Sequence, residues 1–406
     1  MKVLFLCGVF AAENEGEIIS HAKAAVEYSA NRFQEKLISG FLEQGYDCSV
    51  LSAPFIGAYP MGSDIMFFKG FEQQQEKYEY VNFCNIWGIR NSSRASSLKS
   101  AMRSFIADED DEKLIVVYSP HTPFLEAAVY AKKKDPRIKI TMIVPDLPQY
   151  MNLNSKISLV YKIGKKLDIA SFNKLLVSVD SFVLLTDPMK EILKVGDRPY
   201  IVVEGIVETD VFEENAQKKR ALQKEEGIKY VVYTGKLNEK FGVKLLVDAF
   251  RLLEGEQYRL VLCGRGDLDE YIRSQCDKDS RIIALGQVTP DVAQEWVLKA
   301  DVLVNPRPNN EEYTKYSFPS KNVEYLASGN PVVAYMLDGM TERYRDYINE
   351  IPDENETALK STIEATLQRD IARDEGTAFA EYARNNLSCN KVADRIIELY
   401  KTCKGN

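Results

Sequence analysis

The chain is poor in the residues that usually build metal and redox sites. Its 406 residues include only two histidines, His21 and His121, and seven scattered cysteines without any Cys-x-x-Cys pair. The two histidines are too far apart for the His-x-His or His-x-x-x-His spacing of a ligand pair, so we expect no metal site. An odd number of unpaired cysteines favours a reducing compartment, and we expect a cytoplasmic protein.

A long apolar run and an excess of positive charge are missing as well. No stretch approaches the ~20 apolar residues that span a bilayer, and the first apolar run, residues 1–7, is too short for a signal peptide. The 52 Lys and Arg residues against 60 Asp and Glu give a net charge of −8, most of which lies after residue 205. Nucleic-acid binders need a basic surface, so nucleic acid is not an expected partner.

Short apolar runs alternate with helical patterns along both halves of the chain. Residues 2–7, 113–118 and 139–144 are such runs in the first half, and the pattern restarts at 230–233 and 259–263. Apolar strands separated by helices predict parallel sheets that are covered on both faces. We therefore expect an α/β protein of two Rossmann-like, doubly wound domains facing a cleft, with ligands beyond the carboxyl ends of the strands.

The break between the two domains is expected at the Glu-Gly-Ile sequence of residues 204–206. This places an N-terminal domain at 1–205 and a C-terminal domain at 206–388. The last segment, 389–406, is predicted to form a helix that could cross back to the first domain.

Two lysines follow the strand predicted at 230–233. Lys236 and Lys240 come after the turn at Gly235, where a helix begins, and cations beyond a strand end are what a diphosphate needs. Surface lysines that contact only water are the more common case. The Gly264-Arg265-Gly266 turn leaves amides free to approach a phosphate or a base, although such turns are also common without a ligand.

A proline-containing loop, residues 315–319, leads into a helix that is predicted to start near Ser320. Amides at a helix start can hold phosphate or sugar oxygens, but Ser320 could equally be a simple helix cap. Glu324 lies about one turn into this helix. Its carboxylate could accept hydrogen bonds from both hydroxyls of a ribose, or it could be an ordinary surface glutamate.

These residues resemble a known family. The segment from about 230 to 347 is similar to the nucleotide-sugar domain of the GT-B glycosyltransferases (glycosyl transferases group 1), and it looks like retaining family 4 in a Ser-Phe-Pro-Ser-Lys subtype. Five ordered motifs carry the resemblance: Gly242-Val243 with the Leu-Leu-x-x-Ala-Phe helix, Cys263-Gly264-Arg265-Gly266, Leu285-Gly286-Gln287-Val288, the run from Ala300 to Pro306, and Ser317-Phe318-Pro319-Ser320-Lys321 through Pro331-Val332-Val333. The first domain matches only at single landmarks: Gly8, His121, Asp146 and residues 204–206.

The resemblance implies roles for individual residues. Lys236 and Lys240 are the expected basic pair on the donor diphosphate, and His121 is expected to contact the transferred sugar, which makes these three the candidate catalytic residues. Donor binding is implied for Gly235, Gly264, Arg265, Val288, Tyr316, Ser317, Phe318, Pro319, Ser320, Lys321 and Glu324. The resemblance makes 1–205 the acceptor-side domain and 206–388 the nucleotide-sugar domain, and it implies Gly8 and Asp146 on the acceptor side. The resemblance implies no metal and no cofactor, only a nucleotide diphosphate sugar as co-substrate.

Two positions depart from the family pattern. Most members have a second glutamate eight residues before Glu324, where this chain has Tyr316. Glu311 or Glu312 could take over its contact with the donor sugar. The second lysine usually stands where Phe241 is found, and Lys240 comes one position earlier. Both departures resemble a subtype of the family, and they leave the identity of the sugar open.

The implied activity is transfer of a hexosyl unit to a saccharide or lipid-linked saccharide, with retention, in bacterial-type surface polysaccharide or glycolipid assembly. Two alternatives remain at this point. Tyr316 favours a catalytically inactive, glycosyltransferase-like partner protein. A nucleotide-sugar epimerase could share the architecture; it would need acid and base carboxylates or histidines in the cleft, and the scarcity of histidine is a weak argument against it.

A basic stretch in the first domain suggests where the acceptor comes from. Residues 113–174 carry 11 basic and 4 acidic side chains, and 155–167 has the spacing of an amphipathic helix. Such a surface is typical of peripheral docking on an anionic membrane, here its inner face. A solvated helix face fits the same residues equally well.

Overall fold

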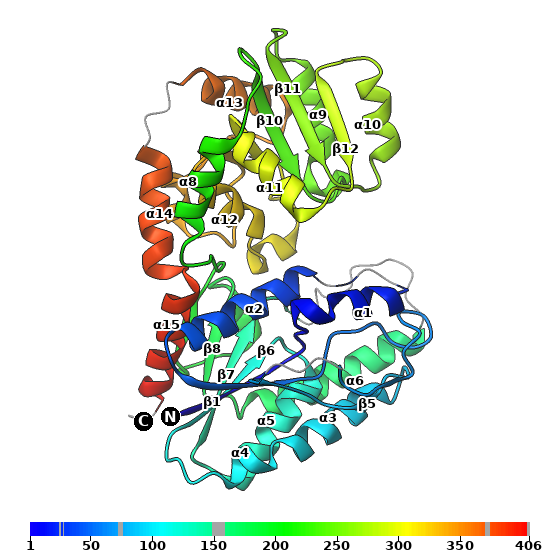
Figure 1. Cartoon of the computed structure of the whole chain (residues 1–406), viewed down its shortest axis with the longest axis vertical. Coiled ribbons are helices and arrows are strands. Elements are labelled where there is room, and N and C mark those ends of the chain that lie inside the picture. Colours follow the sequence, from blue (N-terminus) through cyan, green and yellow to red (C-terminus); the bar gives the residue numbers. More distant parts are fainter. Residues whose placement is uncertain (24–25, 27, 72–75, 148–158, 370–373, 404–406) are drawn as a thin grey trace. The chain divides into compact units, whose positions relative to one another are not determined.

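The computed structural model describes residues 1–23, 26, 28–71, 76–147, 159–369 and 374–403 (Figure 1). The chain divides into two compact units. Unit 1 consists of Met1–Ile206 together with Ser388–Asn406, and unit 2 consists of Val207–Leu387. The two units are described separately below.

Unit 1 is built on a seven-stranded sheet in the order β4-β2-β1-β6-β7-β8-β9, and all neighbouring strands are parallel. The strands are β1 (Lys2–Cys7), β2 (Asp47–Ser52), β4 (Tyr78–Tyr80), β6 (Lys113–Tyr118), β7 (Ile138–Val144), β8 (Ser181–Leu184) and β9 (Tyr200–Val202). Every residue of β6 is buried, as expected of a strand covered on both faces. The strand order reverses between β1 and β6, so the residues that follow these two strands meet at one edge of the sheet.

Helices cover both faces of this sheet. They are α1 (Glu15–His21), α2 (Tyr28–Glu43), α3 (Arg90–Ala101), α4 (Arg103–Ala107), α5 (Thr122–Lys134), α6 (Leu159–Leu176), α7 (Met189–Ile192) and α15 (Cys389–Thr402), with a 3-10 turn η1 at Ala12–Asn14. Figure 1 shows α3, α4, α5 and α6 on the opposite side of the sheet from α2. A two-stranded antiparallel ribbon, β3 (Phe67–Phe68) with β5 (Phe83–Cys84), lies outside the main sheet.

The C-terminal helix α15 completes the core of unit 1. It packs along α2 so closely that a Cβ at Gly40 would overlap the carbonyl oxygen of Cys389. Phe41 of α2 and Ile396 of α15 are fully buried in one cluster with Phe5 of β1, and the rings of Phe5 and Phe41 meet edge-on at 6.4 Å. Residues from both ends of the chain therefore form one hydrophobic core.

Unit 2 repeats the same architecture. Its six-stranded sheet has the order β12-β11-β10-β13-β14-β15, again with parallel neighbours throughout. The strands are β10 (Lys229–Thr234), β11 (Tyr258–Cys263), β12 (Ile282–Gly286), β13 (Val302–Asn305), β14 (Val332–Ala334) and β15 (Asn349–Glu350). Counted along the chain this is the order 3-2-1-4-5-6 of a doubly wound fold, with the reversal between β10 and β13.

The helices of unit 2 bury one apolar face each against this sheet. They are α8 (Val211–Ala221), α9 (Val243–Arg251), α10 (Asp269–Cys276), α11 (Pro290–Lys299), α12 (Ser320–Ala327), α13 (Glu356–Gln368) and α14 (Asp374–Asn386), with 3-10 turns η2 (Glu239–Phe241), η3 (Glu312–Tyr316) and η4 (Glu342–Asp346). In α9, for example, Val243, Leu246, Val247 and Phe250 are buried at helical spacing. The expectation of two doubly wound α/β domains is confirmed.

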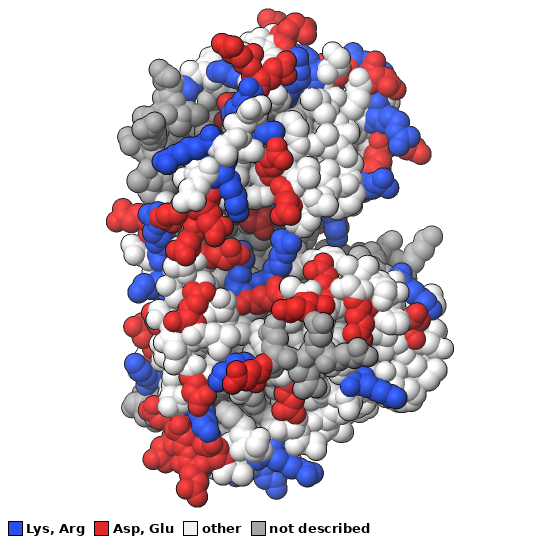
Figure 2. Space-filling view, in the orientation of Figure 1, with Lys and Arg blue, Asp and Glu red and all other residues white. Residues whose placement is uncertain are grey.

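The charged surface is mixed, with one acidic concentration in unit 1. Figure 2 shows acidic side chains gathered at its lower end, where the loop after α4 carries residues 108–112. Some lysines of the basic stretch 113–174 form ion pairs within unit 1, so their charge is not available to a ligand or a membrane. Lys113 is fully buried against Asp135, and Lys132 and Lys139 both pair with Asp180.

The side chains of residues 148–163, which include the first part of the amphipathic stretch 155–167, lie outside the described residues. Within the described part of the chain, no helix is long and apolar enough to cross a membrane.

Candidate functional site

The candidate site of unit 2 lies where its strand order reverses, at the carboxyl ends of β10 and β13. Parallel strands end here in loops that leave room for a ligand between them. β10 ends at Thr234, directly before Gly235, and β13 ends at Asn305. Helix α12, which begins with the Ser-Phe-Pro-Ser-Lys loop, starts between these two strand ends.

Glycine turns close the strand ends tightly. The amide of Gly235 donates to the carbonyl of Cys263 (2.7 Å), and that of Gly264 donates to the carbonyl of Gly286 (2.8 Å). Gly235 and Gly264 have φ angles of +132° and +141°, and a Cβ at Gly264 would overlap the carbonyl oxygen of Gly235. Only glycine is comfortable in such a conformation, so both turns depend on it.

Two buried side chains fix α12 to both strand ends. The hydroxyl of Tyr325 accepts a hydrogen bond from the amide of Thr234 at the end of β10 (2.9 Å). Asn305, at the end of β13, donates from its side-chain amide to Oδ1 of Asn322 (2.7 Å). Tyr325 and Asn322 are both fully buried. The first turn of α12 is therefore held in one position relative to the sheet.

The start of α12 offers amides that its own helix does not use. A helix leaves its first amides without intrahelical partners. Here the amide of Asn322 bonds to the carbonyl of Pro319 (2.8 Å), which leaves those of Ser320 and Lys321 unused among the described residues. Pro319 has no N–H, and the ring of Phe318 is buried against Tyr344, so these two residues shape the loop instead of contacting a ligand through polar side-chain groups.

Lys321 brings a charged group into this corner. A Cβ at Gly235 would lie 2.5 Å from Cε of Lys321, so the end of this side chain rests against the Gly235 turn. Desolvation lowers the pKa of its ammonium below the usual 10.5, Glu324 raises it by attraction, and Lys236 lowers it by repulsion. No described residue forms a hydrogen bond or ion pair with Nζ of Lys321. The fold thus places a largely desolvated cation beside the Gly235 turn.

The two lysines predicted on the diphosphate are both present at the end of β10. Lys236 is exposed and acts electrostatically on Lys321, and its carbonyl accepts a hydrogen bond from the hydroxyl of Tyr233 (3.0 Å). Lys240, in η2, is exposed, and its ammonium lies 5.1 Å from the centre of the Phe241 ring. Unit 2 therefore carries Lys236 and Lys321 close together, with Lys240 on the following turn.

The remaining donor-side residues lie around the same strand ends. Glu324 is exposed on α12, one turn after Ser320. Arg265 is exposed after β11, its carbonyl accepts from the amide of Leu237 (3.0 Å), and its Nε lies 4.0 Å from the Cβ position of Gly286. Val288, Tyr316 and Ser317 are half-buried. The hydroxyl of Ser317 has a charged neighbour.

That neighbour, Arg307, is a residue that the sequence did not single out. Its Nη2 donates to the hydroxyl of Ser317 (2.7 Å), and its guanidinium lies 5.1 Å from the ring centre of Tyr313. Its Nε is buried and has no hydrogen-bond partner among the described residues. Arg307 comes two residues after the end of β13, and this position at the strand reversal was the signal that could have revealed it.

Unit 1 has a corresponding site where β1 and β6 end. The amide of Gly8 donates to Oε1 of Gln34 (3.0 Å), and its carbonyl accepts from the amide of Phe55 (2.9 Å). A Cβ at Gly8 would lie 2.6 Å from the ring of Phe55. The same ring meets His121 edge-on, with centroids 5.5 Å apart, so Phe55 connects the two predicted residues Gly8 and His121.

His121 is held in an apolar and positively charged setting. It precedes α5, and its ring lies 4.6 Å from that of Phe124. Burial lowers its pKa well below the usual 6.5, and the charges of Arg94 and Arg90 lower it further. Its Nδ1 is buried without a hydrogen-bond partner among the described residues. The imidazole is consequently neutral at physiological pH.

The described acidic side chains near the two sites do not form a metal site. Asp146 follows β7. The pKa of Tyr118 is raised mainly by its burial, and the negative charge of Asp146 raises it further. Among the described residues, no group of three or more His, Cys, Asp or Glu side chains comes close enough to hold a metal ion. The positive charge of the site in unit 2 comes from lysine and arginine.

A comparison with known families covers this same part of the chain. Residues 228–369 match glycosyl transferases group 1. The matched segment runs from the start of β10 to the end of α13, so it includes both strand ends, the glycine turns and all of α12. This supports the family resemblance for unit 2. The finer subtype stays a prediction.

Curated relatives that are named as glycosyltransferases match this chain over part of their length. An uncharacterised glycosyltransferase of Methanocaldococcus jannaschii is 25% identical over 204 residues, which are 47% of this chain and 49% of that protein. The phosphatidyl-myo-inositol mannosyltransferase of Mycobacterium leprae is 31% identical over 180 residues, 43% of this chain and 46% of that protein. The chain thus spans about half the length of the curated relatives that it matches.

Solved structures extend the likeness to the whole chain. A glycosyltransferase from Rickettsia africae has a TM-score of 0.66 at 14% identity, covering 100% of this chain and 99% of that one. The Anabaena protein HepE, crystallised with UDP, has a TM-score of 0.59 at 14% identity, covering 99% and 100%. Sucrose-phosphate synthase from Thermosynechococcus elongatus reaches 0.64 at 15%, covering both chains fully. At these identities the likeness shows the fold alone, and that fold is GT-B.

Proposed function

We propose that this protein is a glycosyltransferase that moves a hexosyl unit from a nucleotide diphosphate sugar to an acceptor hydroxyl. Unit 2 binds the donor and unit 1 binds the acceptor. The proposal covers the whole chain, whereas the family match covers residues 228–369 only. It is supported by the names of the relatives, and by a structural neighbour that holds UDP.

One observation carries the proposal. Lys321, a desolvated cation without a described partner, lies against the Gly235 turn and beside the unused amides at the start of α12. Tyr325 and Asn322 hold this helix start against both strand ends of the reversal point. A diphosphate is a ligand that needs several cations and amides aimed at one place. Lys236 supplies a second cation there.

The chemistry follows from where charge develops. The bond between the anomeric carbon and the diphosphate oxygen breaks, and negative charge grows on the leaving phosphate. Fixed cations and amides lower this barrier because they need no rearrangement during the reaction. In a retaining, front-side reaction the acceptor oxygen bonds to the anomeric carbon on the same face, and its proton passes to the leaving phosphate. No separate basic side chain is then required.

The rest of the proposal assigns the other predicted residues. Glu324, exposed on α12, accepts hydrogen bonds from the ribose hydroxyls, and Arg265 and Val288 surround the base. In unit 1, the neutral imidazole of His121 contacts sugar hydroxyls without adding charge. We propose a lipid-linked saccharide as acceptor, in bacterial-type glycolipid or polysaccharide assembly, because a curated relative is named for transfer to a phosphatidyl lipid.

The first experiment identifies the donor and then tests the site. Thermal shift with a panel of UDP-, GDP- and ADP-sugars should single out one donor, since a ligand at 100 times its Kd adds ~2.7 kcal/mol of stability. With that donor, Lys240→Ala and Glu324→Ala should each lose affinity or turnover. Removing one oxyanion-type contact costs ~10²–10³ in rate.

Matched controls lie at the other end of the same sheet. Lys278→Ala and Glu226→Ala remove exposed charges near the amino ends of β12 and β10 and should change nothing. Normal donor affinity and turnover in both site variants would refute the placement of the site. Donor binding with no transfer to any acceptor would support the inactive partner protein, and interconversion of the donor sugar without acceptor would support an epimerase.

A further inference from the structure

Unit 1 exposes an unusual number of large apolar side chains in one region. Met61 is 85% exposed, Phe67 57% and Trp87 56%, and three more large apolar residues there are exposed too. Isolated exposed apolar residues are common, but a contiguous group marks a binding surface. We call this group the ribbon patch: Ile19, Met61, Met66, Phe67, Trp87 and Ile89.

Backbone pairing connects the segments that carry the ribbon patch. Phe67 pairs across the β3–β5 ribbon with Cys84, and the amide of Asn85 bonds to the carbonyl of Met66 (2.8 Å). Tyr59 forms a bridge with Ile86, directly before Trp87. These contacts bring the segments 59–67 and 84–89 side by side.

The end of α1 joins the same surface. Ala22 forms a bridge with Ser63, and the imidazole of His21 pairs with Asp64 (2.7 Å). Ile19, two residues before the end of α1, is therefore close along the chain to the residues that pair with the loop carrying Met61.

The loop that presents Met61 is held in shape. The amide of Gly62 bonds to the carbonyl of Ala58 (2.7 Å), and the Cβ position of Gly62 lies 2.8 Å from Cα of Gly57. Two glycines in such close backbone contact leave no space for side chains between them. The amide of Lys23 also bonds to the carbonyl of Gly62 (3.0 Å). These contacts fix the loop in a conformation that leaves the side chain of Met61 in solvent.

We propose that the ribbon patch docks unit 1 on an anionic lipid bilayer. Trp, Phe, Met and Ile side chains that project from turns insert into the headgroup boundary, where an aromatic ring is at home. Two exposed lysines of the same segments, Lys23 and Lys69, complement anionic headgroups. The stretch 113–174, by contrast, uses Lys113, Lys132 and Lys139 in internal ion pairs.

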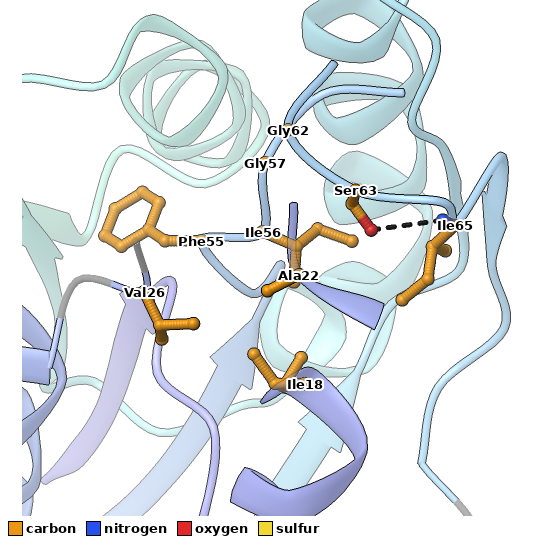
Figure 3. A pocket seen from close by; sticks show the side chains of 9 residues that line it. All are labelled: Ile18, Ala22, Val26, Phe55, Ile56, Gly57, Gly62, Ser63 and Ile65. Atoms are coloured by element: carbon orange, nitrogen blue, oxygen red, sulfur yellow. Dashed lines mark hydrogen bonds between the residues drawn. The ribbon is translucent and has the colours of Figure 1, made fainter. Parts of the chain in front are cut away.

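A small hollow lies beside the segments that carry the ribbon patch (Figure 3). It is lined by Ile18, Ala22, Val26, Phe55, Ile56, Gly57, Gly62, Ser63 and Ile65. Ile18 and Ile65 are chain neighbours of the patch residues Ile19 and Met66. Phe55, another lining residue, has its ring against Gly8 and His121.

A role for the docking surface follows if the acceptor is a lipid-linked saccharide, and this step rests on the proposed function. A lipid-linked acceptor keeps its lipid in the bilayer while its saccharide has to reach the end of β1. The lining residues of the hollow include Ile65, next to the patch residue Met66, and Phe55, next to Gly8.

The test uses the scarcity of tryptophan. The chain has two tryptophans, and Trp296 belongs to unit 2, so Trp296→Phe leaves Trp87 as the only one. With vesicles of phosphatidylcholine and phosphatidylglycerol, Trp87 emission should move to shorter wavelength and be quenched by brominated lipid. The protein should float with these vesicles and far less with phosphatidylcholine alone. Unchanged emission and no flotation would overturn the proposal.

Variants then locate the surface. Met61→Ser, Phe67→Ser and Trp87→Ser combined should raise the lipid concentration for half binding roughly tenfold or more. Val177→Ser, 78% exposed at the end of α6, is the matched control and should bind normally. Binding of the sugar donor should be the same in all of these proteins, so a failed donor assay and a failed flotation assay are separate results.

Three outcomes would contradict the assignment. The triple variant could float like the unmodified protein. Lys165→Gln with Lys166→Gln could abolish flotation while the triple variant keeps it, which would place the membrane face on α6. The Trp87 emission could shift with protein concentration in the absence of lipid, which would make the ribbon patch a contact between two copies of the chain.

Discussion

The end of the Lys321 side chain lies where any side chain at Gly235 would have to be. A Cβ at Gly235 would be 2.5 Å from Cε of Lys321 and 3.6 Å from the hydroxyl of Tyr233. The absence of a side chain at the end of β10 is thus what lets a cation from α12 reach the strand end. This pair joins two motifs that are far apart in the sequence.

The first prediction concerns Gly235→Ala. The added methyl group would push the ammonium of Lys321 away, and φ of +132° would cost roughly 1–3 kcal/mol. Donor affinity, measured by calorimetry, should fall about 10–100-fold, the value of a charge-assisted hydrogen bond. Gly227→Ala is the matched control, since Gly227 also has positive φ (+77°) but no atom within 4 Å of its Cβ position. That control should lower Tm and leave donor affinity intact, and equal affinity losses in both would contradict the argument.

The second prediction separates the stability and function of Lys321. Burying a cation without a partner costs free energy, so Lys321→Met should raise the Tm of the free protein. The same variant should weaken donor binding about 10–100-fold, because it removes one cation from the diphosphate. Lys278→Met, at an exposed position, should change neither quantity. A Tm that falls together with affinity would mean that Lys321 is structural.

The lowered pKa of Lys321 adds a pH dependence to this prediction. Below that pKa the lysine is charged and can bind a diphosphate, and above it the affinity is lost. The folded state binds fewer protons than the unfolded state between the lowered pKa and 10.5, so folding becomes more favourable as pH rises through this window. Donor affinity should therefore decline at a lower pH than an ordinary lysine would give, and Lys321→Met should remove this step.

The sequence allowed those features to be predicted that depend on residues close together in the chain. Apolar strands, glycine turns and the Ser-Phe-Pro-Ser-Lys loop allowed the two doubly wound sheets and the end of β10 to be predicted. Arg307 was not predicted, although it comes two residues after the end of β13, because the sequence does not show which side chain it contacts. Its contact with Ser317 exists only once α12 is placed against β13.

Other features depended on contacts between distant residues. The burial of Lys113 against Asp135 could not be predicted from the sequence, because these residues are 22 positions apart and the stretch between 113 and 174 is mainly basic. The ribbon patch depends on pairing between segments about 20 residues apart along the chain, and an apolar residue in a sequence is normally expected inside. Which apolar side chains stay outside is a property of the tertiary fold.

The third prediction concerns the charge of His121. Its pKa lies well below 6.5 because of burial and the charges of Arg94 and Arg90. The chain has one other histidine, so His21→Gln leaves a single imidazole signal for NMR. That signal should keep one chemical shift from pH 8 down through 6.5, with no titration in this range. A midpoint near 6.5 would contradict the structure.

A companion variant tests the cause. Arg94 is 1% exposed, its Nη2 donates to the carbonyl of Pro54 (2.7 Å), and its guanidinium lies 4.4 Å from the ring centre of Phe83. Arg94→Met keeps the length of the side chain and removes the charge. It should move the pKa of His121 upward, but only in part, since burial remains as the larger cause.

The last prediction concerns the stability of unit 1. Lys113 is fully buried, and its ammonium contacts Oδ2 of Asp135 at 2.8 Å. Asp135→Asn would leave that cation buried without a carboxylate and should cost about 3–5 kcal/mol. Hydrogen exchange of the β6 and β7 amides reports on unit 1 alone and is the appropriate measurement in a chain of two units. Asp111→Asn, at an exposed pair with Arg137 (3.6 Å), is the matched control and should cost at most ~1 kcal/mol.

The pH dependence of this pair has a definite sign. The hydrogen bonds from Arg137 and Lys113 hold the pKa of Asp135 far below its usual range. The ion pair therefore contributes its full stability above about pH 4, which is the pKa of an aspartate side chain in the unfolded protein. This contribution is lost as the pH falls further. The difference in protection between the unmodified protein and Asp135→Asn should accordingly shrink below pH 4 and stay constant from pH 5 to 8. A difference that narrows toward pH 8 would show that another group is responsible.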